Sequence, residues 1–159
     1  MLLWDYDAKP ESAADQLANI LFLVPQISVL PEKLSESHRA MLCHYLKFMD
    51  DNRDVLLDGN LVPLDAQANY AQVYAERDGR VIAALYANPV FAVPDGTEEL
   101  TVVNASESDF VYLDGADKLG GAAYTITDCM GNPTAEGKLS GEGLVKLSVP
   151  HCGFLTIKK

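Results

Sequence analysis

The feature that most constrains the fold of this chain is a change of periodicity near residue 65. Before it, apolar residues recur every three or four positions, which is the spacing of a helix with one buried face. After it, short β-rich runs alternate with clusters of Gly, Pro, Asn and Asp, a pattern typical of strands joined by tight turns. We therefore predict two parts, a largely helical part over 1–64 and a β-rich part over 65–159.

Two helices are predicted in the first part. The first begins after Pro10 and is ended by Pro25, and its apolar face comprises Ala13, Ala14, Leu17, Ala18, Leu21 and Val24. The second begins near Ser35, a good N-cap residue, and Gly59 is a suitable stop. Ahead of both helices, Met1 to Trp4 has the apolar character of a short strand.

The second part is predicted to be an antiparallel β-sandwich. Its clearest signal is Asp78-Gly79 between two β-rich runs, which is typical of a hairpin with a tight turn. Roughly seven or eight short strands at this spacing favour a sandwich. The predicted strands are 72–77, 80–86, 100–103, 110–113, 123–127, 134–139, 144–149 and 154–157.

Composition limits the partners. The 159 residues are 48% hydrophobic, enough for a core, and carry a formal net charge of -11. That charge repels a phosphate backbone and an anionic bilayer, so we expect no nucleic-acid and no membrane partner. No apolar run is long enough to span a bilayer and no signal peptide is recognised, so a soluble cytoplasmic protein is expected.

The cysteines and histidines carry no metal motif. Cys43, Cys129 and Cys152 lack C-x-x-C spacing, which argues against a disulfide framework and a structural zinc site. We therefore expect reduced thiols, no metal and no cofactor. His151-Cys152 lies in a turn before the last strand, and a Cys–His nucleophilic pair is left there as a minor alternative.

The end of the first predicted strand offers a possible sugar site. Trp4, Asp5 and Asp7 sit where the C-terminal end of a barrel strand would place them, and barrel enzymes bind substrates at that end. The alternative is a strand end at which Trp4 packs on a neighbouring element. Asp5 and Asp7 alternate about the strand, so they would point apart and form a poor pair for retaining glycoside hydrolysis.

Several stretches in this order resemble the C-terminal part of alpha-galactosidases of the melibiase type, glycoside hydrolase family 36 and its relatives. They are Met1–Asp5, Glu11–Leu17, Val24–Val29, Asn52–Gly59, Leu61, Pro63 and Asn69-Tyr70. The resemblance implies a β-sandwich preceded by a remnant of the last βα unit of a (β/α)8 barrel. Residues 1–4 would be the eighth barrel strand, 11–24 the helix after it, and 36–57 a helix that bridges barrel and sandwich.

The resemblance also bears on function. The catalytic aspartates of the family lie on earlier barrel strands, so no catalytic residue is assigned here and the chain alone is expected to be inactive. Trp4 and Asp5 match the last barrel strand, and the resemblance implies that they lie near an alpha-galactoside in a full-length hydrolase. The expected role of this chain is structural, as the C-terminal fragment of such an enzyme in carbohydrate metabolism.

Two rivals remain open. A free-standing carbohydrate-binding sandwich would need exposed aromatic side chains on one sheet face, and the candidates are Tyr74, Tyr86, Tyr112 and Tyr124. An oligomerisation module would follow if the barrel strands are missing, because apolar side chains of the first strand and helix would then be uncovered. These side chains are Leu2, Leu3, Leu17 and Leu21.

Overall fold

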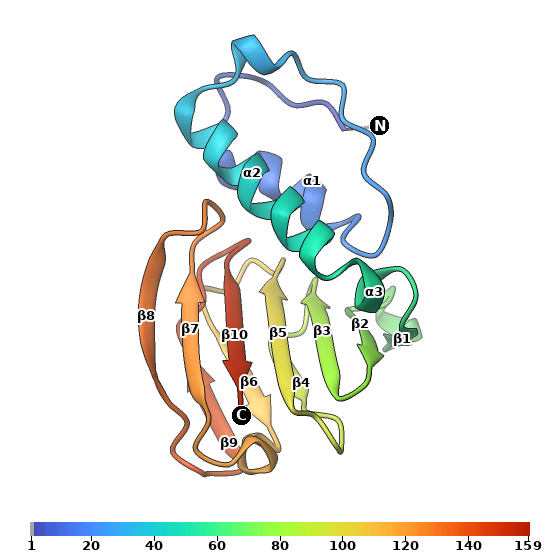
Figure 1. Cartoon of the computed structure of the whole chain (residues 1–159), viewed down its shortest axis with the longest axis vertical. Coiled ribbons are helices and arrows are strands. Elements are labelled where there is room, and N and C mark those ends of the chain that lie inside the picture. The colour runs from blue at the N-terminus through green and yellow to red at the C-terminus, as the bar shows by residue number, and fades with distance from the viewer. Residues whose placement is uncertain (1) are drawn as a thin grey trace.

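A computed structural model describes residues 2–159 and places a helical layer across one end of a β-sandwich (Figure 1). Met1, the predicted start of the first strand, lies outside the described residues. The helices are α1 (Pro10–Ala18), α2 (Glu36–Asp51) and α3 (Arg53–Leu56), with 3-10 turns η1 (Pro31–Lys33), η2 (Ala66–Ala68) and η3 (Ala116–Leu119). Within residues 2–159, no helix has the length and apolarity needed to cross a bilayer.

Ten strands form two sheets, which confirms the prediction of a mostly β chain with helices near its N-terminus. A seven-stranded sheet has the order β1-β2-β3-β5-β10-β7-β8, and a three-stranded sheet has the order β4-β6-β9. The strands are β1 (Asn60–Leu64), β2 (Gln72–Arg77), β3 (Arg80–Leu85), β4 (Val90–Ala92), β5 (Glu99–Asn104), β6 (Val111–Asp114), β7 (Ala123–Thr127), β8 (Pro133–Lys138), β9 (Leu144–Leu147) and β10 (Phe154–Lys158).

The sheets are mixed, so the prediction of a wholly antiparallel sandwich is wrong in two places. β3 pairs in parallel with β5, and β4 pairs in parallel with β6. Parallel neighbours need a crossover connection between them. Here β4, in the other sheet, lies on the path from β3 to β5, and β5 does the same between β4 and β6.

Two strands were not predicted from the sequence. β1 contains Pro63, which lacks an N–H donor, but β1 is an edge strand paired only with β2, where proline is tolerated. The predicted boundary after residue 64 therefore falls between two paired strands. β4 has only three residues, too few for a period-two pattern to be recognised.

The second helix begins as predicted. The Ser35 hydroxyl accepts a hydrogen bond from the backbone N–H of His38 at 3.2 Å, so Ser35 is the N-cap. The helix breaks at Asn52, whose side-chain amide donates to the carbonyl of Phe48, and resumes as α3. Gly59 follows, and a Cβ there would lie 2.3 Å from the carbonyl oxygen of Val55, so only glycine fits.

The first helix is shorter than predicted. It ends at Ala18, not near Val24, and Asn19 caps it with its N–H bonded to the Asp15 carbonyl. A series of turns then carries the chain to Pro25. Leu21 is still fully buried although it lies in these turns, whereas Val24 is exposed, so the apolar spacing predicted burial as far as Leu21 and overestimated the length of the helix.

Of the first predicted strand, the structure shows only a single parallel bridge. Leu2 pairs with Ile27, and its backbone bonds to Gln26 and Ser28 on either side. α1 lies between these two segments in the chain, so the unit is a short strand, a helix and a second short strand. This is a βαβ-like arrangement, the connection that parallel pairing requires.

The central strands of the large sheet are covered on both faces at the end nearest the helices. On β3, Val81, Ala83 and Leu85 point into the core shared with the small sheet, whereas Ile82 and Ala84 belong to the core shared with the helices. This alternation follows from the period of two along a strand. α2 crosses the near face of the sheet at its upper end, with α1 behind it (Figure 1).

Candidate functional site

Trp4 and Asp5, the predicted sugar-binding residues, lie in different surroundings: Trp4 is buried and Asp5 is exposed. Trp4 is only 6% exposed, and its ring lies 6.1 Å from the ring of buried His38. Asp5 is exposed, and its carboxylate accepts the N–H of Asp7 at 3.0 Å. The Trp4 ring therefore packs into the helical layer, as the alternative reading of this stretch expected.

The tyrosines proposed as a sugar platform are engaged in packing. Tyr74 stacks edge-on against Phe91, and Tyr86 donates its hydroxyl to the Ala18 carbonyl at 3.2 Å. The other two are also partly buried, Tyr112 against Phe110 and Tyr124 against the inner core. Since binding sandwiches stack sugars on open aromatic faces, these four positions do not favour a carbohydrate-binding surface.

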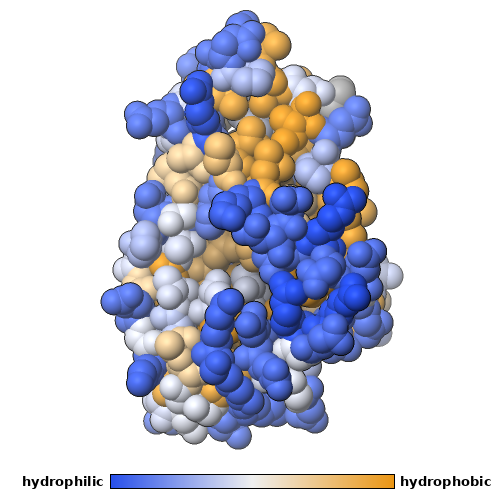
Figure 2. Space-filling view, viewed as in Figure 1, coloured by the Kyte–Doolittle hydropathy of each residue, from blue (hydrophilic) through white to orange (hydrophobic). Residues whose placement is uncertain are grey.

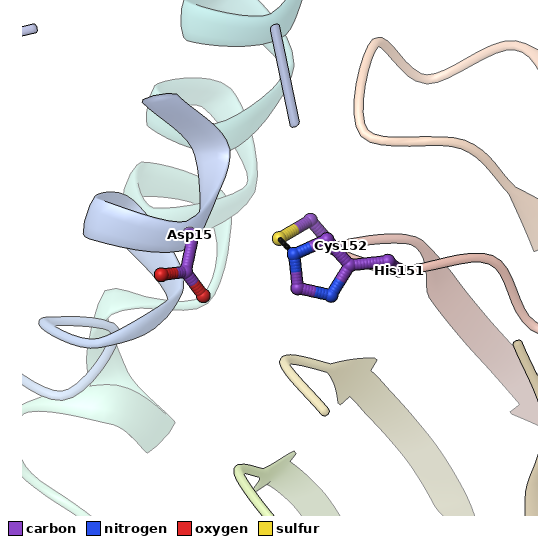
Figure 3. A group of neighbouring side chains, drawn as sticks. All are labelled: Asp15, His151 and Cys152. Carbon is purple, nitrogen blue, oxygen red and sulfur yellow. Dashed lines mark hydrogen bonds between the residues drawn. The ribbon is translucent and has the colours of Figure 1, made fainter. Parts of the chain in front are cut away.

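A cluster of three different ligand-type side chains lies where α1 meets the turn between β9 and β10. Asp15 comes from α1, and His151 and Cys152 come from the turn (Figure 3). A carboxylate oxygen, an imidazole nitrogen and a thiol sulfur from these residues all lie within 4.8 Å of one another. The cluster therefore joins the two ends of the chain.

The turn that carries His151 and Cys152 is tightly fixed. The N–H of Gly153 bonds to the Pro150 carbonyl at 2.9 Å, and Cys152 has a left-handed φ of 57°. Asn104, at the end of β5, accepts the Cys152 N–H on its backbone carbonyl at 2.7 Å. Its side-chain amide also donates to the carbonyl of Val149 at 2.8 Å, so both ends of the turn are held by one residue.

The imidazole of His151 is oriented by the backbone. Its Nδ1 lies 2.7 Å from the Ser106 carbonyl oxygen, which can only accept, so Nδ1 carries the proton. Nε2 is then the unprotonated nitrogen, and it lies 3.4 Å from the Cys152 sulfur. The lone pair of His151 therefore points at Cys152 (Figure 3).

Burial keeps the Cys152 thiol protonated. Burial raises its pKa well above the ordinary value, and the negative charge of Asp15 raises it further. A catalytic cysteine needs the opposite, an electropositive setting that lowers its pKa. The minor alternative of a Cys–His nucleophile is therefore not favoured, although the two side chains do meet.

The cluster borders an open cleft of about 590 Å³. Asp15 and His151 are half-buried and line it, whereas Cys152 is buried behind them. The other residues that line the cleft are mostly polar: Lys9, Glu11, Ser12, Asn19, Tyr86, Ala105 and Glu107. An ion or small ligand in solution could therefore reach the carboxylate and the imidazole.

Sequence reasoning found two of the three members of this cluster. The sequence analysis placed His151-Cys152 in a turn and considered the two as a pair, but it did not consider Asp15 as a ligand or a catalytic residue. No spacing rule links residues at opposite ends of a chain, so the sequence held no signal for the third member.

Comparisons with known proteins add no family. No protein-family model, curated protein or solved structure matches this chain.

Proposed function

We propose that this chain is the non-catalytic C-terminal region of an alpha-galactosidase-like glycoside hydrolase, in which the helical layer packs against a (β/α)8 barrel. The proposal starts from the sequence resemblance to that family. On this reading the sandwich is a structural cap, and cleavage of alpha-galactosides belongs to the barrel.

The observation that carries the proposal is an apolar groove on the helical layer. It has a volume of about 250 Å³ and is lined by Leu21, Leu23, Val24, Pro25, Leu46, Met49, Asp50, Arg53, Leu56 and Leu57. Leu23 and Val24 are 60% and 69% exposed. Figure 2 shows apolar side chains gathered over the helical layer, whereas polar side chains cover much of the sandwich. Apolar surface of this kind marks interaction sites.

The Leu2–Ile27 bridge supports a barrel as the domain that packs against the helical layer. Sheets made only of parallel strands occur almost only in α/β proteins, where helices cover both faces. Here two short segments pair in parallel through a single bridge, with α1 between them. Further parallel strands beside this pair would extend it into the sheet of a barrel and would cover exposed Leu3.

The size of the native polypeptide tests the proposal directly. An antibody against this chain, used on an extract of the source cell, is expected to detect a band several times larger than 17.3 kDa. A band at this chain's own mass would overturn the assignment to a larger hydrolase.

Activity of the isolated chain provides a second test. Purified protein is expected to release no phenol from an aryl alpha-galactoside, because the catalytic aspartates of the family lie upstream. Turnover that disappears in the Asp5→Asn variant would contradict a purely structural role.

A further inference from the structure

We propose that Asp15, His151 and Cys152 form a binding site for a zinc-class divalent cation, with one carboxylate, one imidazole and one thiolate ligand. This inference concerns a different part of the molecule from the apolar groove and does not depend on the proposed function. The sequence predicted no metal site, because the three residues share no motif.

The separation of the two neighbouring ligands fits zinc. With Zn–S near 2.3 Å and Zn–N near 2.0–2.1 Å, a tetrahedral centre places sulfur and nitrogen about 3.6 Å apart. The observed distance from Cys152 Sγ to His151 Nε2 is 3.4 Å. This pair can therefore take up an ion with little movement.

Asp15 lies close enough to provide the third ligand. Its carboxylate oxygen lies within 4.8 Å of both other ligand atoms, whereas a tetrahedral site places such an oxygen about 3.5 Å from the sulfur. A side-chain movement of about 1 Å closes that difference. Asp15 is half-buried at the cleft, so its side chain has room to move.

The surroundings of His151 match those of a metal ligand. Metal-bound imidazoles usually donate their other N–H to a carbonyl or carboxylate, which fixes the tautomer and the ring plane. The Nδ1–H of His151 donates to the Ser106 carbonyl at 2.7 Å and leaves the Nε2 lone pair free for an ion. The ring is therefore held in the orientation that a metal ligand needs.

The local charge also favours a cation. Asp15, Glu11 and Glu107 bring three carboxylates to the cleft in front of the sulfur, against the single ammonium group of Lys9. A dication is attracted by this negative charge. On binding, the metal–sulfur bond replaces the sulfur–hydrogen bond and the proton leaves to solvent. The charges of a thiolate, a carboxylate and a dication then sum to zero.

The ligand set selects the type of metal. Calcium and magnesium require oxygen ligands, whereas thiolate and imidazole suit zinc and its neighbours in the first transition series. Three protein ligands leave a fourth tetrahedral position, and the cleft beside Asp15 and His151 gives water access to it. The bound ion would join α1 to the β9–β10 turn and so tie the helical layer to the sandwich.

Cobalt(II) is the probe that identifies these ligands. The reduced full chain is titrated anaerobically with Co²⁺, and we expect one equivalent to bind with an intense near-ultraviolet thiolate-to-cobalt charge-transfer band. The Cys152→Ser variant should lose that band. His151→Gln and Asp15→Asn should weaken Co²⁺ binding at least about tenfold. Zn²⁺ should displace Co²⁺ and should raise the midpoint of thermal unfolding of the wild type but not of Cys152→Ser.

Matched variants separate this site from other thiols and imidazoles. Cys43→Ser, Cys129→Ser and His44→Gln are expected to retain both the band and the affinity, and circular dichroism checks that every variant is folded. The conservative Asp15→Asn change keeps the test valid if a variant in the turn fails to fold. Absence of the band from the wild type, its persistence in Cys152→Ser, or unchanged affinity in Asp15→Asn would each overturn the three-ligand site.

Discussion

The hydroxyl group of Tyr45 donates a 2.9 Å hydrogen bond to the backbone carbonyl of Cys152, 107 residues later in the chain. Tyr45 lies in α2 and is fully buried, and its ring packs edge-on against Phe154 at 4.9 Å. This contact ties the helical layer to the first residues of β10. The two layers are therefore joined by a directed bond as well as by apolar packing.

Removing that hydroxyl should destabilise the chain. In Tyr45→Phe the ring packing is kept, but the buried carbonyl of Cys152 loses its donor, so we expect the free energy of unfolding to fall by about 1–2 kcal/mol. Urea unfolding followed by circular dichroism measures this. Tyr70→Phe, at a side chain that is 50% exposed, is the control and should change stability little. Equal stability of the two variants would contradict the inferred role of the bond.

Gly153 should tolerate no side chain. A Cβ at this position would lie 2.6 Å from the Thr127 carbonyl oxygen and 2.9 Å from the Pro150 carbonyl oxygen. Both are backbone atoms that cannot rotate away, so Gly153→Ala is expected to lower stability by about 1–3 kcal/mol. In Gly143→Ala the nearest atom, Asp117 Oδ1, is 3.7 Å away, so thermal melting of this control should be close to wild type.

His44 should make stability depend on pH in the acidic range. Burial lowers its pKa in the folded state, and the charge of Asp128 opposes this only in part. The unfolded chain then binds more protons than the folded chain between the lowered pKa and about 6.5. Stability should therefore fall as the pH decreases through that window.

Replacing the imidazole tests this assignment. Denaturant unfolding of wild type and His44→Gln is measured from about pH 7.5 down to about pH 5.5, about one unit on either side of the ordinary histidine pKa of about 6.5. The variant is expected to lose less stability on acidification than the wild type. Parallel curves would mean that another group causes the acid sensitivity.

The apolar groove should control self-association of the isolated chain. Leu23 borders the groove and is 60% exposed, whereas Leu144, on β9, is 57% exposed and lies away from it. Leu23→Glu should lower the mass measured by light scattering at high protein concentration, because a charge in the groove opposes apolar contact. Leu144→Glu adds the same charge and should leave the mass unchanged. An equal effect of both variants would indicate general charge repulsion instead of a docking surface.

Sequence signals that involve only a few neighbouring residues predicted the local structure correctly. Asp78 and Gly79 both have left-handed φ angles, of 50° and 78°, and join β2 to β3 in the predicted hairpin. Ser35 caps α2 as expected. In contrast, α1 was predicted six residues too long, from Ala18 to Val24, because the same apolar spacing continues into turns, where Leu21 is buried but Val24 is exposed.

The sequence by itself determined features that depend on neighbouring residues: the Ser35 cap of α2, the Asp78-Gly79 turn and the period-two alternation of the strands. Their cause is steric and lies in backbone dihedral preferences and hydrogen bonds within a few positions. Only the tertiary structure decided that Trp4 is buried, that β3 and β5 are parallel, and that Asp15 meets His151 and Cys152. These outcomes depend on how the two sheets pack on each other and how the helical layer packs on the sandwich. The energy of that packing is summed over contacts between residues far apart in the chain.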